Sequence, residues 1–167
     1  LQKALYPLAA PFVAQVDKEM LRLGGTVHRD NLEAWWAIVH EMLTDPGFRA
    51  EDFARIRQQQ VNAVRDSLRA NNDEELGKEL LYEQVYGDAH PYGRLTSGHA
   101  GDLESITLDD VRRFHRTQLV RGRLTLALAG GYDDAVRDRI WSSTMRLEYI
   151  PRNTPPLPEA GPPAAIT

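Results

Sequence analysis

The segment Arg123–Ala129 alternates between leucine and smaller side chains, and this pattern limits the possible folds more than any other part of the sequence. In an extended chain, successive side chains point to opposite faces. Gly130-Gly131 follows at once and ends the run. The pattern predicts a β-strand with one face toward the core. The two faces would carry Leu124, Leu126 and Leu128 on one side and Thr125, Ala127 and Ala129 on the other.

Most of the remaining chain has apolar residues at steps of three and four, the spacing of a helix with one buried face. Pro7 and Pro11 interrupt this spacing in the first segment, so a bent or two-piece helix is expected there. A second strand is expected over residues 20–28, with a turn or bulge at Gly24-Gly25. The predicted helices cover residues 1–18, about 32–43, 50–69, 73–86, 107–119 and 132–147.

Two local signals refine this outline. Thr107 and Asp110 resemble a capping box and predict a helix start, with Phe114 inside the helix that follows. Residues 87–101 are rich in glycine and turn formers and predict an exposed loop.

Six of the ten prolines lie between Pro151 and Pro163, in a stretch that cannot build a core. We therefore expect one domain over residues 1–150 and a proline-rich linker or tail over 151–167.

Charge and composition exclude several kinds of protein. The formal net charge of -4 provides no basic field for a phosphate backbone, so a nucleic-acid partner is not expected. The absence of cysteine excludes disulfides, thiolate metal sites and cysteine nucleophiles. No apolar run approaches the roughly 18 residues that a membrane-spanning helix needs. Serine hydrolysis also lacks support, because no Gly-x-Ser-x-Gly elbow occurs.

Several short motifs occur along the chain in a fixed order. The motifs are Gly24-Gly25, Asn31-Leu32-Glu33, Asp45-Pro46-Gly47-Phe48, His90-Pro91-Tyr92-Gly93 with Gly98, Leu103 to Thr107 with Asp110-Val111, and Leu128-Ala129-Gly130-Gly131. In these motifs and their order, the chain resembles the pitrilysin/insulinase family of zinc peptidases over about residues 6–135. The resemblance implies an α+β fold in which helices cover one face of a mostly antiparallel sheet, and half-domains that pair to enclose a chamber for peptides.

Active members of that family carry His-x-x-Glu-His on a helix, where both histidines reach zinc and the glutamate acts as base on the bound water. No pair of histidines in this chain has that spacing. In the family register the metal helix would fall at or before Leu1, and a later glutamate ligand near Asp66 or Ser67. We expect Asp66 to be a surface acid, and we assign no catalytic, cofactor-binding or metal-binding residue. The histidines are His28, His40, His90, His99 and His115.

The adjacent residues Trp35 and Trp36 are about 100° apart on a helix, so they cannot point to the same place. One is expected in the core. The other is expected either at the edge of the core or at an interface with a paired half-domain.

Three functions remain open. The chain is either a segment of a working zinc endopeptidase whose metal helix and zinc lie in the longer protein, or a non-catalytic half that binds peptide or pairs with an active half. The third function is a protein-interaction module that uses a helical face and the proline-rich tail. The missing glutamate near Asp66 favours a segment that is not catalytic by itself.

Overall fold

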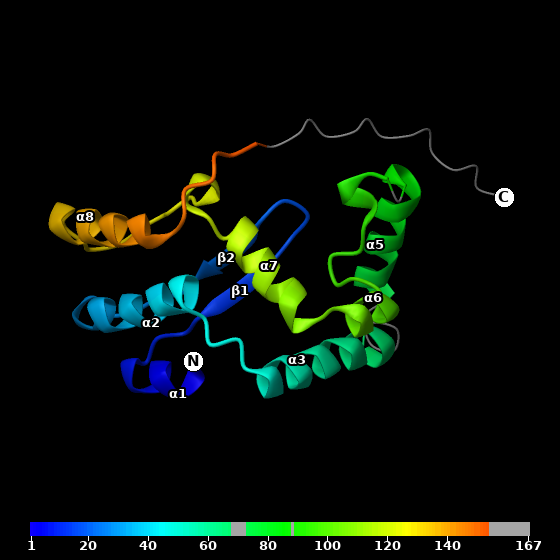
Figure 1. Ribbon diagram of the computed structural model, residues 1–167, viewed down its shortest axis with the longest axis horizontal. Helices are drawn as coiled ribbons and strands as arrows, with labels where there is room; N and C mark the ends of the chain where they lie inside the picture. The colour runs from blue at the N-terminus through cyan, green and yellow to red at the C-terminus, as the bar shows by residue number, and fades with distance from the viewer. Residues whose placement is uncertain (68–72, 88, 154–167) are drawn as a thin grey trace. The chain divides into compact units, whose positions relative to one another are not determined.

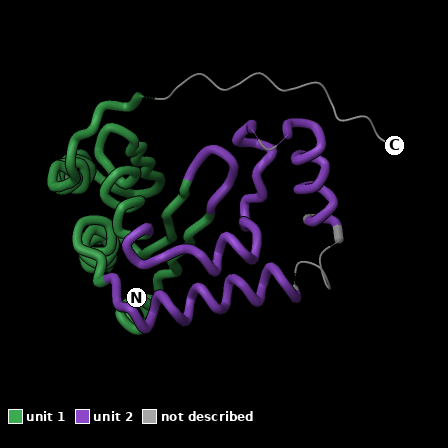
Figure 2. Tube along the Cα trace, turned by 45° about the vertical axis from the view of Figure 1, so that its right-hand side comes forward, with its two compact units in different colours: residues 1–15, 21–47, 111–153 green, residues 16–20, 48–110, 154–167 purple. Residues whose placement is uncertain are grey.

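The computed structural model describes residues 1–67, 73–87 and 89–153, which form mainly helices and one small sheet (Figure 1). The chain divides into two compact units, coloured separately in Figure 2. Unit 1 contains residues 1–15, 21–47 and 111–153, and unit 2 contains residues 16–20 and the described part of 48–110. The elements are α1 (Gln2–Leu5), η1 (Tyr6–Leu8), β1 (Val13–Val16), β2 (Leu21–Gly24), η2 (Arg29–Asn31), α2 (Leu32–Thr44), α3 (Ala50–Asn62), η3 (Ala63–Ser67), α5 (Asp73–Tyr86), η4 (Pro91–Gly93), α6 (Ala100–Ser105), α7 (Leu108–Gln118), η5 (Arg121–Arg123), α8 (Asp134–Ser143) and η6 (Thr144–Arg146).

The first 18 residues form two short helical pieces and a strand. The helix α1 passes into the 3-10 helix η1, which has Pro7 near its start. Ala9 then adopts a left-handed conformation with φ of 47°, which ends the helical run. The prediction of two helical pieces is confirmed, but the prediction that the helix continues through β1 is wrong. Pro11 has no N–H to donate to a helix, and the β-branched valines of β1 favour extended backbone.

Strands β1 and β2 pair as a two-stranded hairpin. Asp17 closes its turn, because its N–H donates to the Met20 carbonyl at 3.1 Å. The Asp17 Oδ1 atom also accepts hydrogen bonds from the N–H groups of Glu19 and Met20, each at 2.8 Å. The strand predicted over residues 20–28 is confirmed as β2, which ends at Gly24.

The core of unit 1 is built around α2. Trp35, which is 8% exposed, and Val39 pack with Leu5 of α1, so Trp35 is the tryptophan that occupies the core. The chain after β2 approaches this core closely at Gly25. A Cβ atom on Gly25 would lie 2.0 Å from the Pro11 carbonyl oxygen and 3.1 Å from the Trp35 ring, so only glycine fits there.

Unit 2 is organised by α3, which packs against α6. Val61 near the end of α3 is 2% exposed. The Arg57 guanidinium donates to the Ile106 carbonyl at 3.0 Å, and this bond ties α3 to the segment after α6. The helix predicted over residues 50–69 is α-helical to Asn62 and continues as the π-helical segment η3. Its last two predicted residues lie outside the described ranges.

The predicted capping box is present. The Thr107 N–H donates to Asp110 Oδ2 at 2.9 Å, and the Asp110 N–H donates to Thr107 Oγ1 at 3.2 Å. Helix α7 follows as expected, but Phe114 is 56% exposed and not inside. The face of α7 that carries Phe114 is open in the described part of the chain, so its helical spacing does not lead to burial.

The loop predicted over residues 87–101 is more ordered than its composition indicates. It contains the 3-10 helix η4, and its last two residues begin α6. His90 is 5% exposed, and a Cβ atom on Gly93 would lie 2.0 Å from the Gly87 carbonyl oxygen. Gly93 therefore allows two backbone segments to pack closely, in addition to favouring a turn.

The β-strand predicted over Arg123–Ala129 is not formed in the described ranges, because Arg123 ends the 3-10 helix η5 and residues 124–129 pair with no strand. Leu124 itself has extended backbone, with φ of -83° and ψ of 129°. The α+β class is confirmed, whereas the larger, mostly antiparallel sheet is not formed by the described residues, whose sheet has two strands. Burial does alternate as predicted, because the leucines are half-buried and the residues between them are exposed. Alternation determines which face is buried, but a ladder also requires a neighbouring strand.

The described residues end at 153, soon after the last helix. Helix α8 and the 3-10 helix η6 occupy most of the predicted segment 132–147. The tail predicted over 151–167 lies outside the described residues from 154 onward, so the boundary at 150 stays a prediction. None of the helices in the described ranges combines the length and apolar character that crossing a bilayer requires.

Candidate functional site

The extended segment 124–129 in unit 1 is fixed firmly at its beginning. The Arg121 N–H donates to the Glu148 carbonyl at 2.9 Å. A Cβ atom on Gly122 would lie 1.9 Å from the Ile150 carbonyl oxygen, so the two backbones are in close contact. Val120, just before this point, is 2% exposed. The segment therefore starts from a rigid anchor and is not a loose loop.

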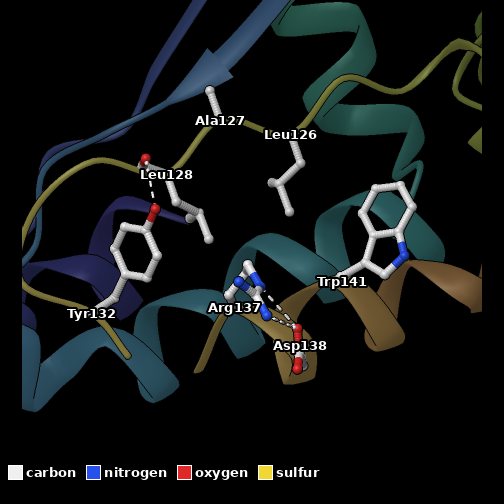
Figure 3. Close-up of a pocket in the computed structure, with 7 residues that line it drawn as sticks. All are labelled: Leu126, Ala127, Leu128, Tyr132, Arg137, Asp138 and Trp141. Carbon is white, nitrogen blue, oxygen red and sulfur yellow. Dashed lines mark hydrogen bonds and ion pairs between the residues drawn. The ribbon is translucent and has the colours of Figure 1, made fainter. Parts of the chain in front are cut away.

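The two backbone edges of this segment differ. On the edge of the leucines, the Leu124 N–H donates to the Arg121 carbonyl at 3.2 Å, and the Leu128 carbonyl accepts from the Tyr132 hydroxyl at 3.4 Å (Figure 3). On the other edge, no hydrogen bond from elsewhere in the described ranges reaches the backbone of Thr125, Ala127 or Ala129. We call this row of three residues the open edge.

A shallow pocket of about 470 Å³ lies beside the segment. Figure 3 shows the Leu126 and Leu128 side chains on the pocket side of the segment and the Ala127 side chain on the opposite side. Trp141 of α8 forms another wall and is 44% exposed. The pocket therefore offers apolar surface next to an extended backbone. Its lining consists of Leu126, Ala127, Leu128, Tyr132, Arg137, Asp138 and Trp141.

The pocket is lined by one cation, Arg137, whose charge is balanced by neighbouring carboxylates. The Arg137 guanidinium contacts Asp138 at 2.8 Å and Asp134 at 2.7 Å. The hydrogen bond to Asp138, and then the negative charge of Asp134, raise the pKa of Arg137 above its ordinary value. Arg137 stays charged but is balanced by these two carboxylates. The pocket thus suits an apolar side chain better than a free anion.

Helix α8, which carries three of the seven lining residues, has a defined start and a packed inner face. Asp133 caps it by accepting a hydrogen bond from the Val136 N–H at 2.8 Å. Ile140 is buried on the inner face. The Trp36 Nε1–H of α2 donates to Ser143 Oγ at 2.8 Å. Trp36 is therefore a half-buried residue at the edge of the core, which was one of the two places predicted for it.

The histidines have separate structural roles. His40 Nε2 lies 3.0 Å from the Ser143 carbonyl oxygen, and His115 Nε2 lies 2.9 Å from that of Leu43. Buried His90 accepts from the Tyr92 N–H at 3.1 Å through Nδ1. Its ring stacks on Tyr86 with centroids 4.8 Å apart. The remaining two are the exposed His28, whose Nδ1 accepts from the Asp30 N–H at 3.4 Å, and His99, which precedes α6.

These positions do not fit the zinc site that the family resemblance implies for an active half. Asp66 is exposed on the π-helical segment η3, and the side chain of Ser67 is not among those described. Across the described residues, no three histidine, aspartate or glutamate side chains lie close enough together to hold a metal ion.

Comparison with solved structures identifies the fold. The chain matches the crystal structure of a peptidase M16 inactive domain from Pseudomonas fluorescens with a TM-score of 0.83 and 23% sequence identity. This chain has an M16 fold. The match covers 98% of this chain and 39% of the matched chain. The family resemblance drawn from the motifs is thus confirmed at the level of the fold. No family model matches the sequence, and no curated protein does.

Sequence reasoning assigned no site residue and so missed the pocket of this M16-like chain. The alternation over residues 124–129 indicated one wall. Nothing in the sequence marked Tyr132, Arg137 or Trp141, because they reach the pocket only through the fold of α8 and the turn before it. An alternating segment followed by an amphipathic helix is the one signal that points there.

Proposed function

We propose that this chain is a non-catalytic part of an M16-type peptidase and that it binds polypeptide in an extended conformation along the open edge. The observation that carries the proposal is the extended, anchored segment 124–129, whose Thr125, Ala127 and Ala129 backbone groups have no partner in the described ranges. An exposed row of N–H and C=O groups is a template for a further strand.

The pocket adds selectivity to this backbone pairing. A strand added at the open edge continues the face of Leu126 and Leu128, so its own alternate side chains reach the side on which the pocket lies. Trp141 offers an exposed aromatic surface there. Arg137 is already balanced by Asp134 and Asp138, so the favoured ligand residue is apolar. The expected ligand is an extended peptide with apolar residues at every second position.

The proposal that this chain is non-catalytic rests on the arrangement of its histidines, which are the possible metal ligands. Three of the histidines make hydrogen bonds that hold the fold: His40 to Ser143, His115 to Leu43, and His90 within its own turn. Each ring has a second nitrogen that could bind a metal, but across the described residues no three histidine, aspartate or glutamate side chains lie close enough together to hold one. The matched structure also carries the name of an inactive domain. We therefore propose that any zinc of the whole protein is bound outside this chain.

The test uses a fluorescent peptide with alternating valine and threonine residues. Its control is the same peptide with N-methyl groups on alternate amides, which removes the backbone donors but keeps the side chains. The proposal expects fluorescence anisotropy to rise with the first peptide and not with the second, and mass spectrometry to find the peptide intact with or without added zinc.

Two results would overturn the proposal in different ways. Cleavage that a chelator blocks would make the chain a catalytic segment. Equal binding of both peptides would show that backbone pairing is not the mode of recognition. Binding of a partner protein through the exposed face of α7 around Phe114 or through the proline-rich tail, with none at the open edge, would favour the third function, a protein-interaction module.

A further inference from the structure

The open edge has a sequence that complements itself, and we propose that it pairs with the open edge of a second copy of this chain. The inference rests on the proposed function, because it names the polypeptide that occupies the edge. The pairing is antiparallel about a two-fold axis that passes beside Ala127. Such an isologous contact uses the same surface on both copies.

The register follows from the geometry of antiparallel strands. When Ala127 lies opposite Ala127 of the second copy, Thr125 lies opposite Ala129, and all three residues present backbone groups on the same edge. None of these groups has a partner in the described ranges. The pairing supplies both the N–H and the C=O partners that each of them needs. The leucine edge is less available, because Leu124 N–H and the Leu128 carbonyl already have partners.

The side chains agree with this register. Leu126 of one copy lies opposite Leu128 of the other, so the leucine faces of both copies join in one apolar layer. Thr125, Ala127 and Ala129 occupy the other face, where they are small enough to leave both backbones accessible. A shift by one residue would place leucine opposite alanine or threonine on every pair and is therefore disfavoured.

Charge complementarity identifies the second copy as the partner. The segment is preceded by Arg121 and Arg123 and followed by Asp133 and Asp134. Antiparallel pairing brings the basic end of each copy toward the acidic end of the other. Arg123 is exposed, and its guanidinium donates a hydrogen bond to the Gln118 side chain. The Asp134 side chain is 85% exposed although its Oδ1 atom contacts Arg137 at 2.7 Å, so Arg123 of the other copy can approach its second carboxylate oxygen.

The test is sedimentation equilibrium of the purified chain over a wide range of protein concentration, for the wild type, Ala127→Pro and the control Ala127→Ser. Proline removes the central N–H donor while the segment stays extended, and serine keeps that donor. The wild type and Ala127→Ser are expected to dimerise. The association constant of Ala127→Pro should be lower by about tenfold or more. Circular dichroism checks that each variant is folded.

A charge exchange supplies a second, independent arm. Arg123→Glu places like charges at both ends of the contact and should weaken dimerisation, more strongly at low salt. Adding Asp134→Arg to the same chain reverses both ends and should restore it. Dimerisation that neither Ala127→Pro nor Arg123→Glu weakens would show that the copies associate elsewhere and would overturn the inference.

The inference and the proposed function fail in distinguishable ways. A chain that stays monomeric at its highest soluble concentration but binds the alternating peptide keeps the proposed function and removes the second copy. A chain that does neither loses both. Slow amide exchange at Ala127 in the dilute monomer would show that another segment of the same chain covers the edge, and this also overturns the inference.

Discussion

The hairpin β1–β2 and the segment 124–129 are both extended, yet they meet the needs of extended backbone in opposite ways. In the hairpin the backbone groups pair with each other, while Val13 and Val16 of β1 remain exposed. In segment 124–129 the leucines are half-buried, and the backbone of the open edge is unpaired in the described ranges. Pairing and burial are therefore separate requirements, and here each region satisfies one of them.

The difference has a functional meaning. A hairpin closes its own edge locally, because Asp17 holds the turn and the two strands are neighbours in sequence. Segment 124–129 has no neighbouring strand within reach of a short turn, since α7 and α8 flank it. It keeps an apolar face and a row of donors and acceptors for a partner. The second region is therefore where recognition is expected.

The largest expected loss of stability comes from a substitution next to the hairpin. Gly25→Ala places a methyl group 2.0 Å from the Pro11 carbonyl oxygen, so the backbone after β2 must move. We expect a loss of about 3 kcal/mol in the free energy of unfolding, measured by urea denaturation. The control is Gly24→Ala, where no atom lies within 4 Å of the added methyl group. Equal effects of the two substitutions would contradict this account of the hairpin.

A somewhat smaller effect is expected at the anchor of the unpaired region. Gly122→Ala would bring a methyl group to 1.9 Å from the Ile150 carbonyl oxygen, at a place where both residues are half-buried. We expect about 2 kcal/mol of destabilisation together with weaker binding of the alternating peptide. Gly131→Ala is the matched control at the other end of the segment, because nothing lies within 4 Å there. Unchanged peptide binding in Gly122→Ala would show that the anchor does not preorganise the edge.

A third substitution tests how the tip of the hairpin is held inside unit 2. Lys18 Nζ lies 2.6 Å from Glu79 and donates to the Arg94 carbonyl at 2.5 Å, and both side chains of the ion pair are mostly buried. Lys18→Met should destabilise the protein by about 1 to 2 kcal/mol, because Glu79 loses its cation. A double-mutant cycle with Glu79→Gln isolates the pair. A coupling free energy near zero would remove this contact from the account of the hairpin.

How far the sequence predicts these two regions depends on what each signal encodes. The alternation over 124–129 correctly predicts which face is buried, but the predicted strand is not formed in the described ranges, because pairing depends on a partner that a local pattern cannot contain. The spacing of Leu5, Leu8, Phe12 and Val16 is that of a helix. Pro11 and the two valines of β1 nevertheless favour extended backbone at its end. The box at Thr107 and Asp110 was predictable in full, because both partners lie within one turn. The pocket was not, because α8 brings its residues together only in the folded chain.

The smallest expected effect concerns pH at the hairpin tip. The Tyr92 hydroxyl donates to the Glu19 carboxylate, and this hydrogen bond, with burial second, raises the pKa of Tyr92 above its ordinary value. The folded state therefore favours the neutral phenol. The stability from this contact is fully present below the unfolded pKa of about 10 and is lost as the pH rises through the higher folded pKa. Thermal unfolding between neutral and alkaline pH should show this loss, and Tyr92→Phe should abolish that part of the pH dependence.

The most direct test of the central claim is amide hydrogen exchange followed residue by residue in the dilute, monomeric chain. The account predicts slow exchange for the paired amides of β1 and β2 and fast exchange at Thr125, Ala127 and Ala129, with the latter three becoming slow when the alternating peptide is added or the chain is concentrated. Exchange at Ala127 that is as slow as in the hairpin before any partner is present would contradict the claim that this edge is open.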